Sequence, residues 1–370
     1  MTGLYIHFPF CMHKCHYCDF VSFPDQLSEG ERYVDALILE MQEYSGAELD
    51  TVYLGGGTPT ALAPELLARV LSAVRRFFVL TEDCEITVEA NPGTCAEVDF
   101  QKLKEAGVNR VSLGVQSLVD EELRLLGRIH SAEAAKQAFL AARRAGIGNI
   151  SLDLMFSIPG QTEESLLFTL QEMTALSPEH LSCYSLMLCE GTPLYLAAER
   201  GELSLPDEDE DRERYRLITE YLATCGYHRY EISNYAKEGK LSRHNSKYWS
   251  REPYIGLGVA AHSFFENCRY ENPGTLAEYY ERVEKRIRPE GECLTEEDAI
   301  SEFMFLGLRR TDTGVLRQEF ATVFGKNLDD IFGETVEKLC RLGLLTDNGE
   351  RICLTDRGID VSNSVFCEFL

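Results

Sequence analysis

Three cysteines lie close together near the start of the chain, at Cys11, Cys15 and Cys18 in the stretch HFPFCMHKCHYCDF. Thiolates bind soft metals and iron–sulfur clusters, so this C-x₃-C-x₂-C spacing predicts a metal or cluster site. A structural zinc site requires four ligands, usually in two separated pairs, and here His13 or His16 would have to complete it. Three thiolates on a cubane [4Fe–4S] cluster instead leave one iron free to bind a substrate or cofactor. The sequence favours the cluster.

Polar residues also follow the next apolar runs of the chain. The stretch LGGGTPT (54–60) contains three glycines, which permit close backbone approach to a ligand. Glu89, Gln116 and Asp153 come at or near the ends of three later runs. Buried carboxylates are rare unless paired or liganded, and these acceptors suit ribose hydroxyls and an ammonium group. Arg128, in LGRIH, is a candidate partner for a carboxylate.

The segments that carry these residues alternate between two patterns. Short apolar runs have the length of buried strands, and the segments between them have a helical period, as at Val34, Leu37 and Met41. This alternation predicts an α/β fold whose parallel sheet curls into a partial or complete barrel, with chemistry at the carboxyl ends of its strands. The expected strands span 4–8, 51–57, 85–90, 110–117, 150–156 and 181–188, and further helices span 64–79, 97–107, 132–145 and 163–176.

The pattern changes in the second half of the chain. We expect a first domain over 1–225, an irregular connecting segment over 226–294 and a C-terminal domain over 295–370. In the last of these, Thr295 is a candidate helix cap and the Asp347-Asn348-Gly349 sequence suggests a β-turn. Two helices, a hairpin and a helix resemble a winged helix. Its 15 acidic and 8 basic residues disfavour DNA binding and favour packing against the main domain.

The composition narrows the location and partners of the protein. With 36 Lys and Arg against 61 Asp and Glu, the formal charge is −25, which disfavours nucleic acid and anionic lipid as partners. The N-terminus lacks the features of a signal peptide, and no run is long enough for a membrane span. We therefore expect a cytoplasmic protein with reduced thiols. The ten other cysteines are expected to act as small buried hydrophobes.

The cysteine motif after a first strand resembles that of the radical S-adenosylmethionine (SAM) enzymes. The resemblance implies a partial (β/α)₆ TIM-like barrel, a [4Fe–4S] cluster and SAM bound to its open iron through amino and carboxylate groups. In that family one electron from the reduced cluster cleaves SAM to methionine and a 5′-deoxyadenosyl radical. The protein holds the cluster, excludes water and orients the substrate.

The further motifs YIHFPFCMHKCHYCDF, LGGGTPT, VEANPG, SLGVQS, LGRIH and DLMFSIPGQT look like the oxygen-independent coproporphyrinogen III oxidase group and its close relatives. This resemblance covers nearly the whole chain, and Tyr17 flanks the cluster loop beside the third cysteine. The residues that match the group's SAM contacts are Tyr5, Gly56, Gly57, Thr58, Glu89, Gln116, Arg128 and Asp153.

Two branches of this group differ in sequence. The oxidases read C-x₃-C-x₂-C-G-C, but Asp19 and Phe20 follow the third cysteine here, so the fourth cysteine is missing. The HemW-type heme chaperones carry H-N-x-x-Y-W, which RHNSKYWS supplies. A neutral imidazole is a good axial ligand for heme iron, and in a helix the histidine and tyrosine would share a face. The residues matching this motif are His244, Asn245, Tyr248 and Trp249.

The resemblance therefore implies a heme chaperone that binds heme and delivers it to an apo-hemoprotein, as a monomer or a homodimer. A flavodoxin or ferredoxin would donate electrons if the cluster is reduced. Two alternatives stay open: a coproporphyrinogen III dehydrogenase that makes protoporphyrinogen IX by radical decarboxylation, and a radical enzyme with another substrate. Whether the protein is an enzyme is not determined by these motifs.

Overall fold

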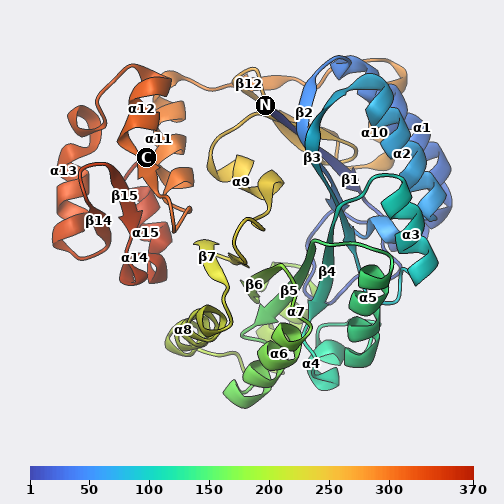
Figure 1. Ribbon diagram of the computed structural model, residues 1–370, viewed down its shortest axis with the longest axis horizontal. Coiled ribbons are helices and arrows are strands. Elements are labelled where there is room, and N and C mark those ends of the chain that lie inside the picture. The colour runs from blue at the N-terminus through green and yellow to red at the C-terminus, as the bar shows by residue number, and fades with distance from the viewer.

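The computed structural model describes residues 1–370, and its centre is one twelve-stranded sheet (Figure 1). Its order is β12-β11-β10-β9-β1-β2-β3-β4-β5-β6-β8-β7, and β1 to β6 run parallel to one another, whereas β8 pairs antiparallel with β6. The predicted α/β partial barrel is confirmed, because the sheet ends at β12 and β7 instead of closing. The parallel strands are β1 (Thr2–Phe8), β2 (Glu48–Gly56), β3 (Val79–Ala90), β4 (Arg110–Gln116), β5 (Ile150–Phe156) and β6 (His180–Ser185).

Helices connect these strands and cover the outside of the sheet (Figure 1). In α1 the side chains of Val34, Leu37 and Met41 are fully buried, so the apolar face that the sequence predicts is the face packed on the core. The helices are α1 (Gly30–Met41), α2 (Pro64–Phe77), α3 (Glu97–Glu105), α4 (Asp120–Leu125), α5 (Ala132–Arg144), α6 (Glu163–Ala175), α7 (Pro193–Glu199) and α8 (Glu208–Thr224), with short 3₁₀ turns η1 (Pro24–Glu29), η2 (Gln42–Tyr44) and η3 (Pro59–Ala61).

The segment 226–294 is not irregular, and that prediction is wrong. It supplies both edges of the main sheet, and β9 pairs in parallel with β1 as a seventh parallel strand. The strands are only three or four residues long and are separated by turns whose residues have positive φ, such as Ala260 and Asn267. The sequence therefore shows little periodicity here. The elements are β7 (His228–Glu231), β8 (Asn234–Ala236), α9 (Arg243–Trp249), β9 (Tyr254–Leu257), β10 (His262–Phe265), β11 (Cys268–Glu271), α10 (Leu276–Glu284) and β12 (Gly291–Cys293).

A disulfide bond joins two edge strands of this segment. Cys268 of β11 and Cys293 of β12 lie directly opposite each other in the antiparallel pair, with their Cα atoms 3.9 Å apart. This bond differs from the expectation that all thiols stay reduced. The pairing of the two strands brings the sulfur atoms together, and the sequence carries no local sign of it.

Residues 295–370 form a separate body that lies beside α9 (Figure 1). Thr295 caps α11 by accepting a hydrogen bond from the Asp298 amide, and the turn at Gly349 joins β14 to β15, as predicted. No helix of the chain combines the length and apolar character that crossing a membrane requires. The elements are α11 (Glu296–Gly307), β13 (Val315–Leu316), α12 (Arg317–Phe324), α13 (Leu328–Arg341), β14 (Leu345–Asp347), β15 (Arg351–Leu354), α14 (Asp356–Asp360) and α15 (Ser362–Cys367).

A buried carboxylate joins α1 to α10 and to the loop after β9. Glu40 is 0% exposed and accepts hydrogen bonds from Gly258 N (2.9 Å), Tyr279 OH (2.6 Å) and Arg282 Nη1 (3.0 Å). We expect Glu40→Ala to lower the free energy of unfolding by about 3–5 kcal/mol, because the buried donors Gly258 N, Tyr279 OH and Arg282 Nη1 would all lose their acceptor. Urea denaturation measures this loss. The exposed Glu31→Ala in the same helix is the control, and a loss below about 1 kcal/mol for Glu40→Ala would contradict the prediction.

Candidate cofactor site

The cysteine loop follows β1 and is tied to the barrel at its base and in its middle. Phe23 N donates to Pro9 O (2.7 Å) and closes the base, while His16 N donates to Leu126 O (3.0 Å). The ring of His16 also bonds Leu125 O through Nδ1 (3.0 Å), which gives this histidine a structural role. The three cysteines are half-buried at the carboxyl end of the parallel strands.

The surroundings of the thiols suit a bound cluster. Cys11 Sγ lies 3.6 Å from Thr58 Oγ1, and Arg128 Nη1 donates to Cys15 Sγ at 3.5 Å. Burial raises the pKa of Cys11, and raises that of Cys18 to about 11, so these thiols must lose protons to bind iron. The guanidinium then balances the negative charge of the thiolates.

The structure contains no preformed site for a single metal ion at the cysteine loop. No three His, Cys, Asp or Glu side chains converge on a point that one metal ion could occupy. A cubane is larger than one ion, so its thiolate ligands lie farther apart than the ligands of a zinc site. His13 is exposed and His16 is bound elsewhere, so neither completes a zinc site here.

The glycine turn after β2 lies beside Glu89. Gly56 has φ +107° and donates its N–H to Glu89 Oε2 (3.0 Å), while Tyr53 OH donates to Oε1 (2.7 Å). A Cβ atom on Gly56 would lie 2.4 Å from the His7 ring, and one on Gly57 would lie 2.7 Å from Phe10 O. Burial raises the pKa of Glu89 to about 7 against the opposing effect of these hydrogen bonds. Only glycine fits this turn. The turn orients the Glu89 carboxylate, which can accept a further hydrogen bond from a ligand.

Asn91 connects the glycine turn to the arginine, and sequence reasoning missed it. Its Nδ2 donates to Thr58 Oγ1 (2.7 Å), and its Oδ1 accepts from Arg128 Nη2 (2.5 Å). Arg128 Nη2 also donates to Gly114 O (2.5 Å) at the end of β4. The signal available in the sequence was the position of Asn91 directly after a strand and two residues past Glu89.

Four other predicted residues lie around this cluster of side chains. Gln116 has φ +66° and its Nε2 lies 3.1 Å from the position of a Cβ atom on Gly114, next to Arg128. Asp153 accepts a hydrogen bond from Ser112 Oγ (3.1 Å), and burial raises its pKa. Tyr17 lies beside Arg128, whose charge opposes the rise in its phenol pKa caused by burial. Tyr5 OH bonds His7 Nδ1 (2.9 Å) lower in the barrel.

The H-N-x-x-Y-W residues lie at the other end of the barrel. As expected, they form a helix, α9, and His244 and Tyr248 share a face. His244 is 1% exposed; its Nδ1 bonds Thr51 Oγ1 (2.9 Å) near the start of β2, and its Nε2 bonds Tyr248 OH (2.9 Å). Burial lowers its pKa to about 3, so the ring is neutral. Asn245 and Trp249 are half-buried, and Arg309 lies 4.3 Å over the Trp249 ring.

The fold and the loop define a class of protein. The chain matches the family described as the Radical SAM superfamily over residues 5–173, and the HemN C-terminal domain over residues 294–361. The whole chain superposes on the structure of the coproporphyrinogen III oxidase HemN from Escherichia coli, with a TM-score of 0.86 at 25% identity, and covers 89% of that chain.

Whole-length relatives place the chain more closely. It is 38% identical to the heme chaperone HemW of Bacillus subtilis and covers 99% of that protein. It is 36% identical to the heme chaperone HemW of Lactococcus lactis and covers 97% of it. The chain belongs to the HemW-type branch of the radical SAM proteins.

Proposed function

We propose that this protein is a heme chaperone that carries a [4Fe–4S] cluster and SAM and transfers heme to an apo-hemoprotein. The observation that carries the proposal is the similarity to HemW proteins along the whole chain. The cluster loop supports it, because Asp19 and Phe20 stand where the oxidases have Gly-Cys.

The proposal gives a role to each side chain at the carboxyl ends of the strands. Cys11, Cys15 and Cys18 would hold the cluster, and Arg128 would balance its charge through its contact with Cys15. Reduced [4Fe–4S] clusters of this family supply the electron that cleaves SAM. The residues proposed to bind SAM are Tyr5, Tyr17, Gly56, Gly57, Thr58, Glu89, Gln116, Arg128 and Asp153, with Glu89 accepting from its amino group and Asp153 from its ribose.

The heme site is proposed at α9, where His244 offers a neutral imidazole. Its Nε2 is bonded to the Tyr248 hydroxyl, so iron would have to replace that hydroxyl. Trp249 and Asn245 lie on the same helix and would contact the porphyrin. Because His244 is 1% exposed, heme binding at this residue requires α9 to shift away from β2.

A second candidate function is the oxidation of a porphyrinogen. The structural likeness to HemN from Escherichia coli favours it, since the whole chain superposes on that oxidase. The missing fourth cysteine argues against it. Two measurements decide between the candidates: hemin titration followed by the Soret band, and anaerobic incubation with coproporphyrinogen III. Saturable heme binding and transfer to an apo-hemoprotein without porphyrinogen turnover support the chaperone, whereas rapid formation of protoporphyrinogen IX would overturn it.

Removing the competing hydroxyl tests the proposed heme ligand. We expect Tyr248→Phe to bind hemin about threefold to tenfold more tightly, because His244 Nε2 no longer has a hydrogen bond to lose. We expect His244→Ala to lose the Soret shift of the ligated heme. Hemin titration of both variants measures the effects. If both variants bind hemin like the unchanged protein, the axial ligand lies elsewhere.

A further inference from the structure

Three rings form a contiguous group inside the barrel, between α9 and Glu89. The rings of Tyr53 and His244 stack with centroids 5.1 Å apart and planes inclined by 27°. The Tyr5 ring lies against both, 6.2 Å from Tyr53 and 6.5 Å from His244. The group therefore extends from the amino end of the strands, where α9 lies, to the carboxylate at their carboxyl end.

At the carboxyl end of the strands, Tyr53 of this group orients the carboxylate of Glu89. Tyr53 OH donates to Glu89 Oε1 at 2.7 Å, and Gly56 N donates to Oε2 at 3.0 Å. Gly56 N belongs to the backbone, so its position stays fixed when the Glu89 side chain moves. The rotation of the Glu89 carboxylate therefore depends on where the Tyr53 ring sits, and the neighbouring His244 ring limits that position.

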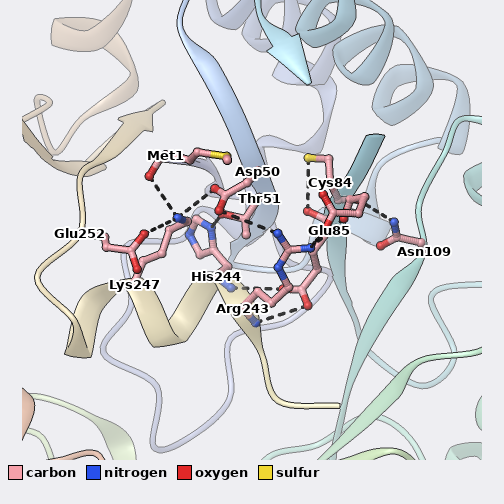
Figure 2. A network of polar contacts seen from close by, with 11 residues as sticks. Met1, Asp50, Thr51, Cys84, Glu85, Asn109, Arg243, His244, Lys247 and Glu252 are labelled. Atoms are coloured by element: carbon pink, nitrogen blue, oxygen red, sulfur yellow. Dashed lines mark hydrogen bonds and ion pairs between the residues drawn. The ribbon is translucent and has the colours of Figure 1, made fainter. Parts of the chain in front are cut away.

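At the amino end of the strands, α9 and its His244 are held by the polar contacts that Figure 2 shows. The amide groups of Arg243 and His244 donate to the two oxygens of Glu85 at 3.3 and 3.2 Å. The buried Lys247 bonds Asp50 (2.9 Å), Glu252 (2.8 Å) and the Met1 carbonyl (3.1 Å). These contacts join α9 to the starts of β1 and β2 and to the middle of β3, and they hold the His244 ring against Tyr53.

We propose that His244 is a positioning residue for SAM: its ring holds Tyr53, and the Tyr53 hydroxyl sets the Glu89 carboxylate that accepts from the SAM amino group. The inference rests on the proposed function, because it assumes that Glu89 binds SAM. The H-N-x-x-Y-W helix would then have a role in the protein without heme, in addition to axial ligation of heme.

Loss of the His244 ring would leave a space beside Tyr53. The phenol could then move away from Glu89, whose buried carboxylate would lose a hydrogen bond that favours its charged form. We expect His244→Ala to weaken SAM binding about twofold to tenfold. We also expect the midpoint of its pH profile to move to higher pH. General destabilisation of the fold does not produce such a shift in midpoint.

Calorimetric titration of SAM into anaerobically reconstituted protein without heme tests this inference. Tyr53→Phe should weaken binding and move the midpoint in the same direction, since it removes the hydroxyl. The effects of His244→Ala and Tyr53→Phe should be less than additive, because both act on one hydrogen bond. Ser246→Ala is the control on α9, since its hydroxyl bonds only Ser242 O of the same helix (2.8 Å).

His244→Phe separates the positioning role from heme ligation. Phenylalanine keeps a ring against Tyr53 but cannot bind iron, so SAM affinity should fall less than in His244→Ala, although the bonds to Thr51 and Tyr248 are lost. This variant and Tyr53→Phe also keep the test decisive if His244→Ala fails to fold. The inference is overturned if folded His244→Ala and Tyr53→Phe bind SAM with the original affinity and pH midpoint. If the unchanged protein itself does not bind SAM, the proposed function fails instead.

Discussion

Replacing Cys15 with alanine is expected to remove nearly all iron and sulfide from the anaerobically reconstituted protein, from about four irons per chain to almost none. Cys15 lies between the other two cysteines of the loop and accepts the hydrogen bond of Arg128. With two thiolates left, a cubane would have two irons without a protein ligand. Iron and sulfide analysis and the visible absorption of the cluster measure the loss.

A second cysteine provides the control for this experiment. Cys225 is half-buried at the C-cap of α8, outside the cofactor site, and Cys225→Ala should keep the full iron content. Full iron content in Cys15→Ala would contradict the cluster assignment. Zinc in the reconstituted protein would also contradict the cluster assignment, because the three thiolates were inferred to bind a cubane with one open iron.

Glu89→Gln is expected to weaken SAM binding by about 30-fold or more, the second large effect. The glutamine amide carries no charge, and its NH₂ group would face either Gly56 N–H or Tyr53 OH, both of which are donors in the present arrangement. One oxygen acceptor for the SAM amino group is therefore lost along with the charge. Calorimetric titration of the reconstituted protein measures the change.

The same residue predicts how SAM binding depends on pH. Burial raises the pKa of Glu89 to about 7 in the cofactor-free protein. Above this pH the carboxylate is charged and accepts from the amino group, and below it the protonated form loses one acceptor site and the charge. We therefore expect affinity to fall by up to about tenfold per pH unit below pH 7, and this dependence to disappear in Glu89→Gln.

Another buried carboxylate is the control for both effects. Glu122 is held by Ser117, Gln161 and Ser165 and has no hydrogen bond to the glycine turn. Glu122→Gln should bind SAM with unchanged affinity and pH profile. If Glu89→Gln behaves like Glu122→Gln, the amino group of SAM binds elsewhere.

Most of the candidate cofactor site could be predicted, because its residues lie in or beside short segments that are recognisable in the sequence. The three cysteines share one loop, and Gly56, Glu89 and Gln116 each lie at or next to the end of a strand whose apolar run is plain in the sequence. Parallel strands bring their carboxyl ends to one edge, so local patterns were enough to gather these side chains. The roles of the residues in binding the cluster and SAM stay predictions. Asn91 was missed because its task is to bridge Thr58 and Arg128, a contact with no sequence pattern.

By itself, the sequence determined the cysteine loop, the alternating strands and helices of the barrel, and the Thr295 cap and the turn at Gly349 in the C-terminal domain. Only the tertiary structure decided that 226–294 completes both edges of the sheet, that Cys268 meets Cys293, and that His244 is buried against Thr51 and Tyr53. The physical reason is sequence separation. Thr51 and His244 lie 193 positions apart, and contacts of this kind depend on strand pairing and burial, which leave no periodic signal in either segment.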